Sequence, residues 1–177
     1  MIKISREFYF LTMTIEQDEI YYMKQALELA KQAYSSNEVP VGAIIVKDNT
    51  IIGKGFNSVI RFSDPTAHAE IVALREAGKT VGNYRILDAD LYVTLEPCLM
   101  CFSAMIHARI RNLYFGAFDY KSGIFSTDKY NFVKNIFNHQ ISIKSGIILE
   151  DSLKLMQDFF KERRGAGAAE RGGLENR

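Results

Sequence analysis

Cysteine and histidine are scarce in this 177-residue chain, which has two cysteines and three histidines. The two cysteines, Cys98 and Cys101, are only three positions apart. They therefore cannot link distant segments into a disulfide framework of the kind that stabilises small secreted proteins. Free thiolates at this spacing require a reducing compartment, and we expect a cytoplasmic protein.

Long apolar runs and an excess of charge of one sign are also missing. No apolar segment approaches the ~20 residues that cross a bilayer, so we expect no membrane partner. The formal net charge is +1, and a nucleic-acid site would therefore depend on a local basic surface rather than on the whole molecule. The sequence has no internal repeat. Its length and its hydrophobic share of 47% are those of one globular domain.

Composition divides the chain into three parts. Residues 1–12 form an N-terminal extension, unless the true start is Met13. Charged residues interrupt the apolar run of this segment, which argues against a signal peptide. Residues 13–164 form the folded domain. Residues 165–177 are small, charged and without periodicity, and this linker-like composition predicts a disordered tail.

The periodicity of apolar residues predicts helices that alternate with strands. The predicted helices are 15–35, 64–77, 97–107, 130–135 and 150–163. Gly78 is the expected stop of the second helix. The predicted strands are 41–46, 51–57, 89–95, 112–115 and 141–148. A hairpin followed by alternating helices and strands indicates an α/β fold, with about five strands in a mixed sheet between two helix layers.

Two short stretches carry residues that suit a metal site. One is Thr66 to Glu70, which contains His68, and the other is Pro97 to Cys101. One imidazole and two thiolates suit zinc, and three protein ligands leave a tetrahedral position for water, as in catalytic sites. Cysteines at i and i+3 share one face of a first helical turn, about 5–6 Å apart at Cβ. The positive end of the helix dipole favours their thiolate form.

Glu70 follows His68 by two residues. A carboxylate beside a zinc-bound water is a natural proton shuttle, and we expect Glu70 to be the catalytic residue. The alternative is a solvated carboxylate that the helix dipole favours in a first turn. The backbone N–H groups of Ala69 and Cys98, both near predicted helix N-termini, are placed to stabilise a developing oxyanion.

The order H-x-E followed by P-C-x-x-C is the signature of zinc-dependent nucleobase deaminases. The flanking segments resemble more specifically those of the bacterial tRNA-specific adenosine deaminases. The segments that carry this resemblance are 38–42, 64–71, 92–98 and 104–107. It extends over residues 38–164 and implies a cytidine-deaminase-like α/β/α fold with one zinc ion per subunit. It also implies a cytoplasmic homodimer that converts adenosine to inosine at the wobble position of a tRNA, tRNA-Arg in this family.

The same resemblance implies a set of residues that contact the anticodon stem-loop. These substrate-binding residues are Asn57, Val41, Ala69, Asp119 and Lys121. Asn57 matches an asparagine that hydrogen-bonds the nucleoside, although an Asn before a loop is ordinarily a turn residue. Residues 124–130 depart from the smaller, glycine-containing stretch of the family, which puts the anticodon-loop contacts of that stretch in doubt.

Several alternatives to this interpretation remain open. The cysteine pair by itself is compatible with a thioredoxin-type redox motif, which leaves His68 and Glu70 unexplained. A structural zinc site would need His107 or His139 as its fourth ligand. A deaminase of free guanine or cytosine, or of a nucleoside, would share the metal core and is the alternative function. A catalytically silent RNA-binding subunit would typically lack the glutamate at position 70.

Overall fold

The computed structural model describes residues 16–172, and the side chains of residues 16–164. The strands within this part are β1 (Gly42–Lys47), β2 (Thr50–Phe56), β3 (Asp90–Leu95), β4 (Asn112–Ala117) and β5 (Ser142–Ser145). The helices are α1 (Gln17–Ser35), α2 (Val59–Phe62), α3 (Ala69–Val81), α4 (Leu99–Ala108), α5 (Lys129–Val133) and α6 (Leu149–Gly172). The predicted N-terminal extension, residues 1–12, lies outside the described residues.

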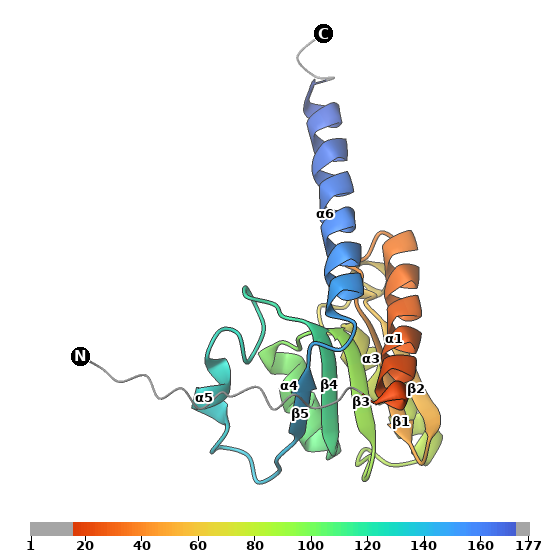
Figure 1. Ribbon diagram of the computed structural model, residues 1–177, viewed down its shortest axis with the longest axis vertical. Coiled ribbons are helices and arrows are strands. Elements are labelled where there is room, and N and C mark those ends of the chain that lie inside the picture. The colour runs from red at the N-terminus through yellow and green to blue at the C-terminus, as the bar shows by residue number, and fades with distance from the viewer. Residues whose placement is uncertain (1–15, 173–177) are drawn as a thin grey trace, which may run out of the picture.

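The strands form one mixed sheet in the order β2-β1-β3-β4-β5 (Figure 1). Strand β1 is antiparallel to both β2 and β3, whereas β3, β4 and β5 are mutually parallel. The predicted α/β class with a five-stranded mixed sheet is therefore confirmed. The carboxyl ends of β3 and β4 lie at the same edge of the sheet, which is where ligands bind in open α/β sheets.

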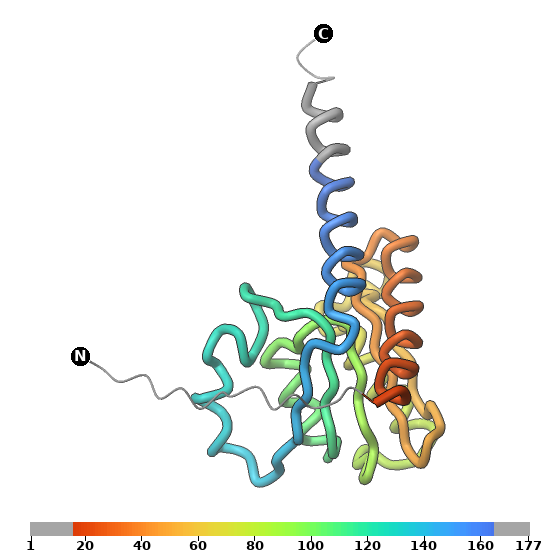
Figure 2. Tube along the Cα trace, in the orientation of Figure 1, coloured from red at the N-terminus to blue at the C-terminus, as the bar shows by residue number. Residues whose placement is uncertain are grey.

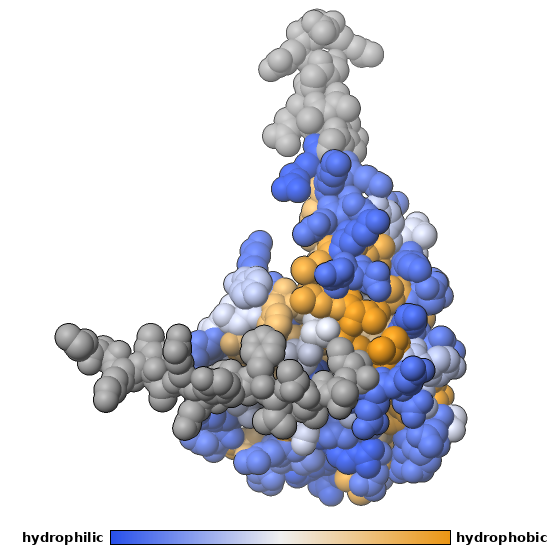
Figure 3. Space-filling model, viewed as in Figure 1, coloured by the Kyte–Doolittle hydropathy of each residue, from blue (hydrophilic) through white to orange (hydrophobic). Residues whose placement is uncertain are grey.

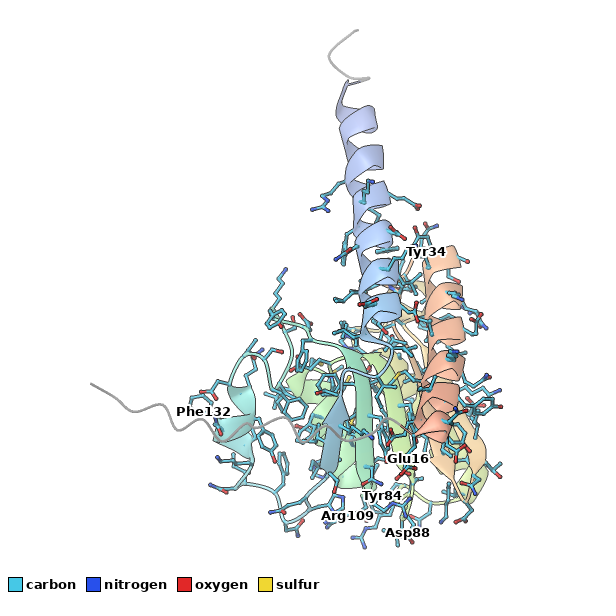
Figure 4. The ribbon with its side chains drawn as sticks, in the orientation of Figure 1. Glu16, Tyr34, Tyr84, Asp88, Arg109 and Phe132 are labelled. Atoms are coloured by element: carbon cyan, nitrogen blue, oxygen red, sulfur yellow. The ribbon has the colours of Figure 1, made fainter. Side chains whose placement is uncertain are left out.

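Alternate residues of the central strands face opposite helix layers. Ala43 and Ile45 of β1 belong to the larger core cluster, which includes residues of α3 and α4. Ile44 and Val46 belong to a second cluster with α1. Helix α6 lies beside α1 on this second face, and Tyr34 lies between them (Figures 1 and 4). The three-layer α/β/α arrangement follows from this period of two along the strands.

Helix α6 is longer than the sequence predicts. It continues to Gly172, past the predicted end at residue 163 and into the segment expected to be a disordered tail; residues 173–177 lie outside the described chain. The first turns of α6 pack beside α1 (Figure 2), and apolar side chains gather on this face of the molecule (Figure 3). No helix in the part of the chain that the structure describes is long and apolar enough to span a membrane.

Helix α3 begins and ends later than predicted. Asp64 Oδ1 accepts hydrogen bonds from Thr66 N at 2.8 Å and Thr66 Oγ1 at 2.7 Å. This turn precedes the helix, because the Asp side chain offers the backbone an alternative to helical hydrogen bonds. The predicted stop at Gly78 is wrong, and Gly82 ends the helix with a φ of 65°. Glycine adopts this left-handed conformation without the steric cost of a side chain.

Two glycines of β2 allow α3 to lie directly on the sheet. A Cβ atom at Gly55 would lie 2.2 Å from the carbonyl oxygen of Ala69 and 2.5 Å from the nitrogen of Ala73. A Cβ atom at Gly53 would lie 2.4 Å from the carbonyl oxygen of Ala73. These contacts involve backbone atoms that a rotamer change cannot relieve. The position of the first turn of α3 therefore depends on the absence of a side chain at Gly55.

We predict that Gly55→Ala lowers the free energy of unfolding by about 1–3 kcal/mol, because the added methyl group pushes α3 away from the sheet. Gly78→Ala is the matched control: its Cβ atom would meet only Asn83 O, at 3.4 Å. Because Gly78 lies inside α3, alanine there should raise stability by about 0.5–1 kcal/mol. Urea unfolding followed by circular dichroism measures both. Equal effects of the two substitutions would contradict the close packing of α3 on β2.

Candidate metal centre and pocket

Two helix N-termini bring the predicted metal ligands together. His68 is the N-cap of α3, Cys98 is the N-cap of α4, and Cys101 lies in the first turn of α4. His68 Nδ1 lies 3.7 Å from Cys98 Sγ and 3.5 Å from Cys101 Sγ. All three ligand atoms lie within 4.8 Å of one another. A single cation can therefore contact the three side chains without a rearrangement of the backbone.

The other two histidines are engaged elsewhere. The ring of His107 packs edge-on against Phe137, with 6.0 Å between centroids. His139 Nε2 lies 2.7 Å from the carbonyl oxygen of Ile110. Among residues 16–172, the candidate ligand group contains three residues, and neither of these histidines belongs to it. The fourth ligand that a structural zinc site would need is therefore not supplied by His107 or His139.

The two thiols of the cluster share one negative charge. A hydrogen bond from Cys101 to Cys98, supported by His68, lowers the pKa of Cys98 to about 4. The same hydrogen bond and burial raise the pKa of Cys101. The pKa of His68 is raised, chiefly by its hydrogen bond to Cys98. A second thiolate so close to the first needs a cation to offset the repulsion, and metal coordination deprotonates a thiol in this way.

Glu70 lies in the first turn of α3 and is buried, with 3% of its surface exposed. Its Oε2 atom is buried without a hydrogen-bond partner in the described structure. Burial raises the pKa of the Glu70 carboxyl to about 7. The alternative of a solvated first-turn carboxylate is therefore wrong. An unpaired buried carboxyl oxygen is costly, and it is ordinarily retained where a ligand, water or ion completes it.

The donor set fits zinc. Two sulfurs and one imidazole nitrogen are the ligands that zinc prefers, and three protein ligands leave a position open. The unpartnered Oε2 of Glu70 supplies an acceptor for a polar group at the same place. The thioredoxin-type alternative explains the cysteine pair alone and accounts for neither His68 nor the buried carboxyl.

A cavity of about 190 Å³ lies over the cluster. This is smaller than the ~300–1,000 Å³ of pockets for drug-sized ligands and suits one planar ring system. The residues that line it are Val39, Val41, Asn57, His68, Glu70, Leu95, Glu96, Cys98, Asp119 and Ser122. Three of the predicted substrate-binding residues, Val41, Asn57 and Asp119, are among them. Ala69 is buried at the start of α3, and Lys121 is exposed on the loop beside the cavity rather than among its lining residues.

Glu96 is a buried carboxylate at the pocket that the sequence analysis did not single out. Its oxygens accept hydrogen bonds from the backbone N–H of Asp119 at 2.9 Å, of Phe125 at 2.7 Å and of Ser126 at 2.8 Å. The Ser126 hydroxyl donates a further one. Gly123 lies so close that a Cβ atom there would be 2.3 Å from Glu96 Cδ. Glu96 therefore holds the loop of residues 119–126 against the start of α4.

Glu38 is a second buried carboxylate and lies behind the cavity-lining residue Asn57 rather than among the lining residues. It is 1% exposed, and its carboxylate accepts a hydrogen bond from Arg61 N at 2.8 Å. Asn57 Nδ2 lies 3.5 Å from the other oxygen of Glu38. A carboxylate beside an apolar strand is expected to be buried only if it is paired. The sequence shows that each glutamate stands next to an apolar segment, but the partners that allow its burial become visible only in the structure.

Comparison with known proteins assigns the chain to a family. Residues 16–117 match the model of the cytidine and deoxycytidylate deaminase zinc-binding region. The chain is 48% identical over 143 residues to a tRNA-specific adenosine deaminase of Haemophilus influenzae, covering 80% of this chain and 83% of the relative.

Two solved structures are also similar. One is described as "Biochemical and Structural Studies of A-to-I Editing by tRNA:A34 Deaminases at the Wobble Position of Transfer RNA". It superposes with a TM-score of 0.73 at 40% identity, covering 76% of this chain and 98% of that one. Guanine deaminase from Bacillus subtilis superposes with a TM-score of 0.53 at 36% identity, covering 63% of this chain and 69% of the guanine deaminase chain. The chain thus belongs to the tRNA-specific adenosine deaminases, within the cytidine and deoxycytidylate deaminase zinc-binding family.

Proposed function

We propose that the chain catalyses the hydrolytic deamination of adenosine to inosine in tRNA, at the wobble position of the anticodon, with tRNA-Arg as its substrate. The observation that carries this proposal is the buried, unpartnered Oε2 of Glu70 beside the His68, Cys98 and Cys101 cluster, under a cavity of one-base size. A carboxyl group in this place serves a proton transfer rather than stability. The adenosine must leave its stack to enter, which an anticodon loop permits more easily than a duplex.

His68, Cys98 and Cys101 would hold one zinc ion per subunit. When bound there, zinc supplies an acidified water molecule as the nucleophile near neutral pH. Glu70 Oε2 takes a proton from the attacking water and delivers it to ring nitrogen 1 of adenine. Glu70 then takes the proton of the new hydroxyl group on carbon 6 and gives it to the departing amine as the bond between carbon 6 and nitrogen breaks, which leaves inosine and ammonia. A pKa of about 7 suits a group that must both accept and donate a proton.

The pocket walls position the base. Val41 contributes an apolar wall, and Asn57 contributes an amide that Glu38 orients. Asp119 borders the cavity from the loop that Glu96 holds. The N–H groups of Ala69 and Cys98, at the N-termini of α3 and α4, stabilise the developing oxygen charge. We further propose a cytoplasmic homodimer whose RNA site draws on both subunits and includes Lys121.

A free-base deaminase is the second candidate, and the similarity to Bacillus subtilis guanine deaminase favours it. We predict that the zinc-loaded chain converts a wobble adenosine in a tRNA-Arg anticodon stem-loop and leaves free adenosine, guanine and cytosine unchanged. Mass spectrometry of the RNA measures conversion of the stem-loop, and ammonia release measures deamination of free adenosine, guanine and cytosine. Conversion of guanine with an unchanged stem-loop would overturn the tRNA proposal and keep the zinc chemistry.

We predict that Glu70→Gln and Cys101→Ala abolish activity for different reasons. Gln keeps the size of the side chain but cannot transfer the proton, so the rate constant kcat should fall about 10²–10⁴-fold while zinc is retained. Loss of the Cys101 thiolate should instead release the metal, which plasma mass spectrometry measures as zinc per chain. Met100→Ala, in the same turn of α4, is the control for both readouts. An active Glu70→Gln enzyme would refute the assigned proton transfer.

We predict that Glu96→Gln loosens the loop of residues 119–126 without loss of zinc. Gln accepts with a single neutral oxygen and turns an amide toward backbone donors, so amide hydrogen exchange in the loop should accelerate by about 10–100-fold. The KM for the stem-loop should rise more than kcat falls. Glu76→Gln is the matched control, because exposed Glu76 accepts a backbone hydrogen bond from Lys54 at 2.8 Å. Equal exchange in the two variants would exclude Glu96 as a positioning residue.

A further inference from the structure

The cavity over the metal ligands accommodates one base, so the neighbouring nucleotides of an RNA loop must lie on its rim. One side of the rim is the loop after β4. Asp119 and Ser122 of this loop line the cavity, and Tyr120 lies between them in the sequence. The Tyr120 side chain is 80% exposed. A large aromatic ring is therefore presented to solvent beside the opening of the pocket.

The Tyr120 ring is supported from behind. Its centroid lies 6.2 Å from that of Phe118, with 27° between the ring planes. Phe118 in turn packs edge-on against Phe115, with 5.2 Å between centroids, and Phe115 is buried in the core. This row of three rings leads from the sheet to the surface. Phe118 thus lies beside the Tyr120 ring at its protein side, and most of the Tyr120 ring is available to a ligand.

The backbone that carries Tyr120 is also held in place. Asp119 N donates to Glu96 Oε2 at 2.9 Å. Asp119 Oδ1 accepts from the backbone N–H of Lys121 at 2.9 Å and of Ser122 at 3.1 Å. Hydrogen bonds thus fix the residues on both sides of Tyr120 before any ligand arrives. Such preorganisation reduces the entropy that binding would otherwise cost.

The charge around Tyr120 indicates the kind of ligand. Lys121 follows it directly and is exposed. Lys129 Nζ lies 3.2 Å from the carbonyl oxygen of Ser122, so a second ammonium group sits at the same loop. An aromatic face beside ammonium groups is the arrangement with which proteins bind single-stranded nucleic acid, where bases stack and phosphates pair with cations.

We propose that Tyr120 is a stacking platform for the unpaired nucleobase adjacent to the target adenosine, and that Lys121 binds a phosphate next to that base. The inference rests on the proposed function. It assigns recognition of the neighbouring nucleotide to a side chain outside the catalytic pocket. Because every base has a π face, this contact contributes affinity for an unstacked loop without selecting one base.

The test uses the zinc-loaded full chain carrying Glu70→Gln, so that the RNA is bound and not consumed. The probe is an anticodon stem-loop with 2-aminopurine on either side of the wobble adenosine. Tyr120→Ala should weaken binding by roughly five- to 150-fold. It should also restore 2-aminopurine fluorescence at one of the two positions, whereas Tyr120→Phe should bind within about twofold of the parent protein.

Salt dependence separates stacking from charge. Tyr120→Ala should leave the slope of log K against log salt unchanged, whereas Lys121→Ala should reduce it by about 0.7. Tyr21→Ala is the matched control, because Tyr21 is an exposed tyrosine on α1 with 56% of its surface accessible. It should leave the affinity unchanged.

Two results would overturn the proposal. One is a Tyr120→Ala protein that binds like the Tyr21→Ala control, and the other is weakened binding with no change in 2-aminopurine fluorescence at either position. If wild type nevertheless deaminates the stem-loop, only the stacking role fails. A wild-type protein that neither binds nor deaminates the stem-loop would refute the proposed function as well.

Discussion

The convergence of two helix N-termini is the constraint on which the site depends. Helix α3 presents His68 and Glu70, and α4 presents Cys98 and Cys101. The ligands come within 4.8 Å of one another because α3 lies directly on β2, where Gly55 has no side chain to hold the helix away. The geometry of the donors is thus a result of backbone packing. A donor set built on rigid elements is held more precisely than one built on loops.

Loops complete the site, and hydrogen bonds to buried carboxylates hold these loops in place as packing holds α3 and α4. Glu96 accepts hydrogen bonds from three backbone N–H groups of the loop after β4. Glu38 accepts one from the backbone N–H of Arg61 and lies near the side-chain amide of Asn57. A charged acceptor that receives several backbone donors forms strong hydrogen bonds and leaves few alternatives to the loop. Both oxygens of Glu38 and of Glu96 have hydrogen-bond partners, whereas the buried Oε2 of Glu70 has none in the described structure.

Local patterns in the sequence predict the cluster of His68, Cys98 and Cys101 and the five-stranded sheet that the structure shows. These features depend on residue type, on spacing and on periodicity, which the chain displays directly. The start of α3 was predicted five residues too early, since the side chain of Asp64 competes with helical hydrogen bonds. The end of α3 also differs from the prediction. Gly78 and Gly82 look alike in the sequence, so the sequence does not show which of the two ends the helix. The role of Glu96 depends on a loop about thirty residues away, which no local pattern contains.

The site therefore separates into a part that packing constrains and a part that it does not. Cys101 and Glu70 are buried, and a change near them disturbs the core as well as the chemistry. Tyr120 and Lys121 are exposed on a loop whose backbone is held by Glu96, so their side chains can vary while the loop keeps its path. A substitution at Tyr120 or Lys121 is therefore expected to change the surface beside the pocket without disturbing the core that holds Cys101 and Glu70.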